Sequence, residues 1–326
     1  PCRSNMCKPT EGGASPTVYL SAPNSQVATA AAGACQGHIT RPMLDGSNNI
    51  WIGVSAPDYS KWEFHQYSSD LGRLDTISCD PSKVSGSTPR YVPPVVGNSQ
   101  TGVSDVIITC SSANPATDES TVMYAMSTSS SAPRTAWSKT VSEMQAAASK
   151  AGLSPPPPLK KEDPYVLFAC ELSAMVVDST GDHVYVGATL TYIPDTTTGP
   201  GDERLCMWVV LCFSTATGDA IFTATAAAPA GSLLPAEEEG ELPIRLQPAP
   251  PLGGSPGGVY AFISGPQSSD KTSVCYIAAD GHRSDAPLNS WPSCSLSSCN
   301  PRIVGAAVGS NDQRNWLYIA GYSTDS

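Results

Sequence analysis

The chain has 326 residues, of which 40% are hydrophobic and 14% charged, so it is long enough to bury a large core. Its net charge of -11 disfavours binding to nucleic-acid phosphates and to anionic lipid surfaces. No apolar stretch reaches the roughly 18 residues of a membrane span. The 27 glycines and 30 prolines favour turns and short strands over long helices, so we expect an all-β protein.

Eleven cysteines are spread along the chain without a Cys-x-x-Cys pair, and there are only four histidines. This pattern indicates disulfides rather than a zinc site, and hence a secreted, extracellular protein. Because the number is odd, at least one cysteine is reduced or bonded outside the chain. The chain begins at Pro1 and not at Met, so we expect that a signal peptide has been removed.

A repeated unit organises the chain after a polar arm at residues 1–16. The clearest copy, residues 178–226, alternates apolar strands with tight turns and predicts a meander of antiparallel strands. The strand that begins at Val184, the second of each unit when the preceding strand at 171–177 is counted, recurs at intervals of 56, 78, 75 and 57 residues. The first apolar residues of these five strands are Ile50, Val106, Val184, Val259 and Trp316.

Five repeats predict a β-propeller of about five blades, which forms one domain over residues 17–326. The fifth unit ends after its second strand, and residues 17–30 have the pattern of a third and fourth strand, so we expect both termini to close the ring. Inserts are predicted at 141–164, with a helix that Ser142 caps and Gly152 ends, and at 226–243. The innermost strands are predicted at 39–44, 91–96, 171–177, 244–248 and 302–308.

The pattern Val184-Tyr185-Val186-Gly187, strand, Thr217-Gly218-Asp219, strand resembles the quinoprotein-like repeat. This blade occurs in many secreted propellers and in pyrroloquinoline-quinone dehydrogenases. The resemblance implies the blade fold. It does not imply the cofactor, because the chain is shorter than those eight-bladed enzymes and lacks the adjacent cysteines against which many of them stack the quinone. We therefore expect no cofactor.

One proline run follows the predicted helix and indicates polyproline II structure. It resembles the Ser/hydroxyproline-rich segments of plant and green-algal wall glycoproteins, which carry O-linked sugars. A stiff spacer between blades is the alternative interpretation. No Asn-x-Ser/Thr sequence occurs, so a glycan is expected to be O-linked. The candidate positions are Ser154, Pro155, Pro156, Pro157 and Pro158.

Catalytic residues are not evident from the pattern. A glycosidase needs two carboxylates about 5 to 10 Å apart, and only Glu171 lies on a predicted innermost strand. The other candidate acids, predicted at structural turns, are Asp45, Asp105, Asp178 and Asp182. The histidines, expected to be solvated or satisfied, are His38, His65, His183 and His282. There is no Gly-x-Ser-x-Gly elbow, so we predict a protein that is not an enzyme.

Three cysteine pairs are the disulfide candidates. Cys294 and Cys299 are expected to close a short loop, as are Cys2 and Cys7, while Cys35 and Cys79 flank the first blade. The odd thiol is expected among Cys110, Cys170, Cys206, Cys212 and Cys275. The tryptophans are expected mainly in the core, except Trp291, a candidate surface contact in a loop.

The leading hypothesis is a structural or adhesive module of a larger secreted assembly or fibre. Its expected partners are other copies of the chain or other extracellular proteins. The first alternative is a carbohydrate-binding propeller with glycans as partners, and the second is a five-bladed glycoside hydrolase.

Overall fold

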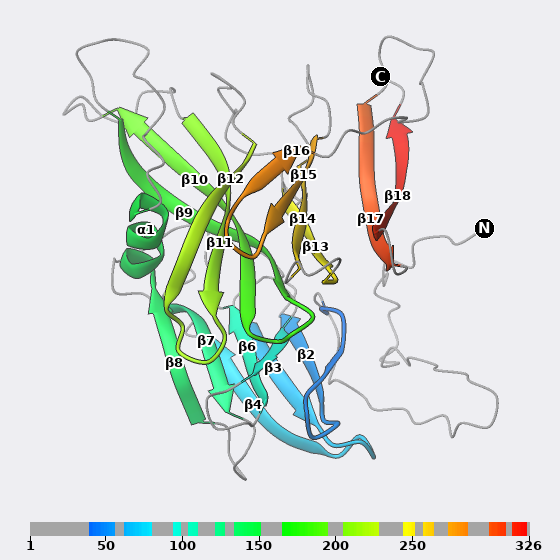
Figure 1. The fold of residues 1–326 in the computed structure, drawn as a ribbon. Helices are drawn as coiled ribbons and strands as arrows, with labels where there is room; N and C mark the ends of the chain where they lie inside the picture. The colour runs from blue at the N-terminus through cyan, green and yellow to red at the C-terminus, as the bar shows by residue number, and fades with distance from the viewer. Residues whose placement is uncertain are drawn as a thin grey trace, which may run out of the picture.

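The computed structural model describes residues 39–55, 62–79, 94–98, 104–109, 121–127, 134–150, 165–194, 205–227, 244–251, 257–263, 273–285, 300–310 and 315–324. Within these ranges the chain folds into five antiparallel β-sheets and one short helix (Figure 1). The predicted all-β class is therefore confirmed. None of the described helical residues forms a segment long and apolar enough to cross a membrane.

Each of the first four sheets contains four strands that are neighbours in sequence. The first sheet consists of β1 (Met43–Leu44), β2 (Ile50–Ser55), β3 (Trp62–Tyr67) and β4 (Arg73–Cys79). The second consists of β5 (Val95–Asn98), β6 (Ser104–Thr109), β7 (Thr121–Ser127) and β8 (Arg134–Thr140). The third consists of β9 (Tyr165–Val177), β10 (His183–Pro194), β11 (Leu205–Ser214) and β12 (Ala220–Ala227).

The last two sheets follow the same plan. The fourth consists of β13 (Ile244–Ala249), β14 (Gly258–Ile263), β15 (Ser273–Ala278) and β16 (Arg283–Asp285). The fifth has two described strands, β17 (Asn300–Ser310) and β18 (Asn315–Thr324). The five strands that the repeat predicted as second strands are β2, β6, β10, β14 and β18, and each pairs with the first strand of its sheet.

Some predicted boundaries are wrong. Of the first strands predicted at 39–44 and 171–177, β1 covers only Met43–Leu44, and β9 begins earlier, at Tyr165. Asp105 was expected in a turn, but it lies inside β6, where it is paired with Gly97 on one side and Ser127 on the other. The apolar residues that follow Asp105 form the centre of β6, and the strand extends back through Asp105 to Ser104. Backbone pairing with β5 and β7 on both sides outweighs the turn preference of aspartate.

Consecutive sheets pack against each other through apolar side chains. Trp51 and Phe64 of the first sheet meet Val106 and Ile108 of the second. Larger clusters join the second sheet to the third and the third to the fourth. Leu317 of the fifth sheet packs against Phe262 and Val274 of the fourth. In the series, the first strand of each sheet contacts that of the next: β1 with β5, β5 with β9, β9 with β13, and β13 with β17.

The predicted ring closure is not seen among the described strands. The segment 17–30, which was expected to complete the fifth sheet, lies outside them, as does the predicted arm at 1–16. Figure 1 shows the fifth sheet beside the fourth, at the opposite end of the series from the first.

Helix α1 (Val141–Lys150) lies in the first predicted insert and contacts the second and third sheets. Its cap is Thr140 and not Ser142, as was predicted. The Thr140 hydroxyl accepts the Glu143 N–H at 3.2 Å, and the Glu143 carboxylate accepts the Thr140 N–H at 2.8 Å. This reciprocal pair is a capping box. Met144 and Ala147 bury the opposite face of the helix, and Gly152 lies outside the described residues.

Candidate functional site

Asp45 anchors the turn from β1 to β2. Its Oδ1 accepts the backbone N–H groups of Ser47 at 2.8 Å and Asn49 at 2.9 Å. Its Oδ2 accepts the indole N–H of Trp51 at 2.9 Å and the amide of Gln66 at 3.3 Å. Burial raises the pKa of the Asp45 carboxyl, but the hydrogen bonds from Trp51, Asn49 and Ser47 outweigh it and hold that pKa below its ordinary value. Its predicted structural role is confirmed.

Asp178 has the equivalent position in the third sheet. Its Oδ1 accepts the Asp182 N–H at 3.0 Å and the Thr180 hydroxyl at 2.9 Å. Its Oδ2 lies 2.6 Å from Nδ1 of His183, the first residue of β10. Asp178 is buried and His183 is half-buried. Both sheets therefore use a carboxylate at the end of the first strand to organise the turn into the second strand.

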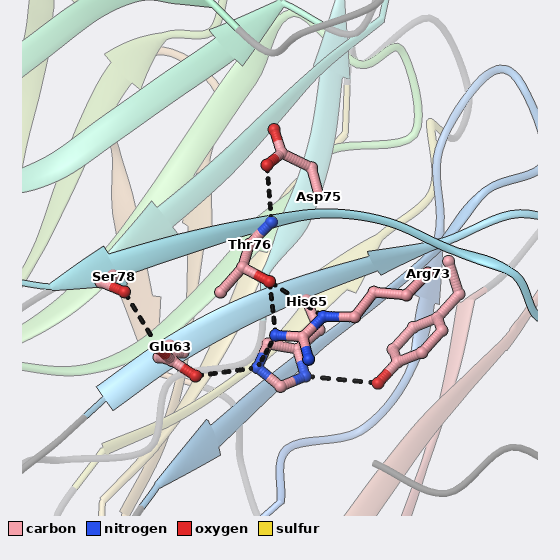
Figure 2. A network of polar contacts seen from close by, with 7 residues as sticks. Glu63, His65, Arg73, Asp75, Thr76 and Ser78 are labelled. Atoms are coloured by element: carbon pink, nitrogen blue, oxygen red, sulfur yellow. Dashed lines mark hydrogen bonds and ion pairs between the residues drawn. The ribbon is translucent and has the colours of Figure 1, made fainter. Parts of the chain in front are cut away.

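Polar side chains on β3 and β4, the outer strands of the first sheet, contact one another (Figure 2). We call them the His65 cluster, and its members are Glu63, His65, Tyr67, Arg73, Thr76 and Ser78. The His65 Nε2 atom lies 3.1 Å from Oε2 of Glu63 and 3.1 Å from Nη2 of Arg73. Its Nδ1 atom lies 3.3 Å from the Tyr67 hydroxyl. Strand alternation places Glu63, His65 and Tyr67 on one face of β3.

The side chains of the His65 cluster connect β3 to β4 and show no arrangement of a catalytic serine. The Ser78 hydroxyl donates to Oε1 of Glu63 at 3.0 Å and is therefore oriented by a carboxylate, whereas an activated serine would donate to the imidazole. The Arg73 guanidinium donates to the Thr76 hydroxyl through Nε at 3.0 Å. The cluster thus ties β4 to β3 through two pairs of side chains, Arg73 with His65 and Ser78 with Glu63.

An aromatic contact joins the second and third sheets. The half-buried Trp137 of β8 donates its indole N–H to the Thr215 carbonyl at 2.8 Å, across 78 residues of sequence. Its ring lies over Gly218, where a Cβ atom would come within 2.7 Å of the ring and where φ is +72°. Thr215 in turn donates its hydroxyl to the Gly181 carbonyl at 2.6 Å. The Trp137 side chain therefore fixes the turn between β11 and β12 to the edge of the second sheet, and Thr215 joins that turn to the one between β9 and β10.

The next interface repeats this contact. Phe222 of β12 lies over Gly281, where φ is +85° and an added Cβ would come within 2.9 Å of the ring. Neither the Trp137–Gly218 contact nor the Phe222–Gly281 contact was predicted from the sequence. The available signal was an aromatic residue in the fourth strand of one repeat and a glycine in the last turn of the next.

Most predicted site residues lie outside the described ranges. These are Cys2, Cys7, Cys35, Cys294, Cys299, Ser154, Pro155, Pro156, Pro157, Pro158 and Trp291. Cys79 ends β4 and Glu171 lies on β9, the first strand of the third sheet, but their side chains are not described. The disulfide, glycosylation and surface-contact assignments therefore stay predictions. Trp51 and Trp208 are buried, as predicted.

Two of the five candidates for the odd thiol are described with their side chains. Cys212 and Cys275 are buried in the apolar cluster between the third and fourth sheets, and neither forms a disulfide. Burial, with a smaller contribution from the Asp178 carboxylate, raises the pKa of the Cys212 thiol to about 12. Elsewhere in the described part of the chain, no three His, Cys, Asp or Glu side chains gather in a way that could hold a metal ion.

Cys212 is expected to resist alkylation in the folded protein. At about pH 8 the raised pKa and the surrounding apolar core should slow its reaction with iodoacetamide at least about 100-fold relative to the unfolded chain. Peptide mass spectrometry of native and urea-unfolded samples gives the two rates, with the unfolded sample as the control. Native labelling within tenfold of the unfolded rate would show that the thiol is accessible.

Neither a scan of protein-family models nor a search of curated proteins found a match to this chain. The resemblances to quinoprotein-like repeats and to wall glycoproteins therefore stay predictions. The geometry described above is what supports a function.

Proposed function

We propose that this chain is a non-enzymatic structural or adhesive module of a larger extracellular assembly, folded as a five-bladed β-propeller that its N- and C-terminal strands close. The observation that carries this proposal is the serial packing of the sheets through their first strands, from β1 to β17. Four-stranded meanders that follow one another around an axis are the arrangement of a propeller, and their short protected edges make it a stable scaffold.

The hydrogen bonds of the buried carboxylates support a scaffold role, because they stabilise turns of the fold. Asp45 and Asp178 are engaged by the donors of their own turns. Trp137 and Phe222 fix one sheet to the next. A rigid frame of this kind holds its loops in defined positions, where they can contact partners.

The outer strands support association with other molecules. β4 and β12 stand at the ends of their sheets, and each exposes an apolar side chain, Leu74 at 54% and Ile221 at 45%. The fifth sheet exposes Tyr318 at 63%. Edge strands with apolar side chains are typical positions for pairing with another chain.

Two truncations test the closed ring, and each is compared with the full chain. Removing residues 1–30 deletes the strands that are predicted to complete the fifth sheet but keeps Cys35, whereas removing residues 1–16 deletes only the predicted arm. We expect the first truncation to lower the melting temperature by about 5 to 15 °C and the second to leave it within about 2 °C. Equal melting temperatures for the two truncations would reject the closed ring.

Sedimentation of the same three proteins tests the assembly. The full chain is expected to form multimers at tens of micromolar, a concentration at which weak protein interfaces are populated. A full chain that stays monomeric under oxidising conditions and binds no extracellular protein would reject the proposed function. Because this readout is independent of the melting temperatures, the closed ring and the proposed assembly can be rejected independently of each other.

A further inference from the structure

The apolar interface between the third and fourth sheets contains two buried polar side chains that form no hydrogen bond with their neighbours. Thr189 of β10 is 5% exposed and Trp208 of β11 is 3% exposed. Among the described residues, none forms a hydrogen bond with Oγ1 of Thr189 or with Nε1 of Trp208. The indoles of Trp51 and Trp137, by contrast, donate to an oxygen atom at 2.9 Å and 2.8 Å. A buried polar group without a partner destabilises a fold, so each of the two groups is expected to have one.

Thr189 and Trp208 are direct cross-strand neighbours. They are opposite each other in the pairing of β10 with β11, and opposite residues of an antiparallel pair lie on the same face of a sheet. Trp208 belongs to the apolar cluster between the third and fourth sheets, so Thr189 lies on the face that meets the fourth sheet. The Cβ atoms of such a pair are about 5 Å apart. One small molecule can therefore contact both side chains.

The chemistry of this pair selects a small neutral molecule. An indole N–H only donates a hydrogen bond, whereas a threonine hydroxyl both donates and accepts. The bridging molecule must therefore accept from Trp208, and it can either donate to Thr189 or accept from it. An ion would lose its hydration in this apolar interface, which costs far more than the burial of a neutral group. A molecule larger than water would displace the closely packed apolar neighbours.

An irregularity in the neighbouring strand pair offers a further hydrogen bond. β12 contains one extra residue, Ala226, opposite the step from Trp208 to Val209 of β11. The backbone groups of an extra residue are left out of the ladder of hydrogen bonds. Buried water commonly forms about three hydrogen bonds. Thr189 and Trp208 provide two of them here, and this bulge can provide the third.

We propose that a water molecule, buried between the third and fourth sheets, bridges the Thr189 hydroxyl and the Trp208 indole. The Tyr185 hydroxyl is also buried and, within the described part of the chain, without a hydrogen-bond partner. Ile244 lies over Gly187, which is the next residue on this face after Tyr185, so the Tyr185 hydroxyl is separated from the bridge. The bridge is a property of the folded chain and does not depend on whether the protein assembles.

A high-resolution crystal structure of the full chain tests the site directly. We expect one spherical peak of electron density within about 3.2 Å of both Oγ1 of Thr189 and Nε1 of Trp208. No peak at this position, a direct hydrogen bond between the two side chains, or density for a larger molecule would overturn the proposal.

Urea unfolding tests the bridge in solution. Thr189→Val keeps the shape of the side chain and removes the hydroxyl. If water bridges the pair, the equilibrium constant of unfolding should increase about fivefold, whereas removal of an unbonded buried hydroxyl would leave it unchanged or lower it. A Thr189→Val protein at least as stable as the wild type would therefore overturn the proposal.

A second substitution assigns the effect to the pair. In the Trp208→Phe background the bridge is already broken, so Thr189→Val should increase the unfolding constant less than about twofold. Trp137→Phe, at the interface of the second and third sheets, is the matched control and should leave the fivefold effect of Thr189→Val unchanged. The same fivefold effect in the Trp208→Phe background would overturn the proposal. If Trp208→Phe fails to fold, the crystal structure and the Thr189→Val measurement still decide.

Discussion

Replacing Asp45 with alanine is expected to lower the free energy of unfolding by about 3 kcal/mol. The substitution leaves the buried indole N–H of Trp51 and the amide of Gln66 without their acceptor, and it removes the acceptor of two backbone N–H groups in the turn. Urea unfolding of the wild type and the variant at about pH 7 measures the difference.

The same comparison should depend on pH. The pKa of Asp45 lies below its ordinary value in the folded protein, so the carboxylate stabilises the fold above about pH 4, and this stabilisation is lost as the pH falls through the folded-state value. The difference between wild type and Asp45→Ala should therefore shrink towards about pH 2. Asp219→Ala is the control, because Asp219 is exposed and accepts one side-chain hydrogen bond in its turn, and it should cost less than about 1 kcal/mol. Equal costs for the two variants would contradict an anchoring role for Asp45.

Replacing Trp137 with alanine is expected to cost about 3 kcal/mol, because it removes the ring that covers Gly218 and the hydrogen bond to the Thr215 carbonyl. Trp137→Phe keeps part of the packing and should cost about half as much. Ile221→Ala is the control, since it shortens an apolar side chain that is 45% exposed, and it should cost less than about 1 kcal/mol.

A double-mutant cycle isolates the contact itself. Gly218→Ala places a Cβ atom against the Trp137 ring and strains the backbone at positive φ. In the Trp137→Ala background only the strain remains, so the cost of Gly218→Ala should fall by about 1 kcal/mol or more. Additive costs would show that the ring and the glycine do not interact.

The strands could be predicted from the sequence because their signals are local. The apolar run at Val184 and the turn at Thr217-Gly218-Asp219 define β10, β11 and β12 within one repeat, and the same reasoning gave the second strand of every sheet. The capping residue of α1 was a local signal that was misread. Thr140 and Glu143 have the three-residue spacing of a capping box, whereas Ser142 does not.

The contacts between sheets could not be predicted in the same way. Alternation shows which residues share a face, but not which face of another sheet they meet. The contact between Trp137 and Thr215, which are 78 positions apart, therefore could not be predicted from alternation. The His65 cluster is an intermediate case. The spacing of Glu63, His65 and Tyr67 already places them on one side of a strand, but the approach of Arg73 depends on an irregularity in the pairing of β3 with β4.

The serial contact of the sheets bears on how the chain reaches its native state during synthesis. Each sheet meets the one that is made just before it, so the sheets can consolidate one after another as the polypeptide leaves the ribosome. Translation pauses after β8 or β12 would then leave partly built but already compact intermediates, and a nascent chain arrested there should resist proteases over its first two or three sheets.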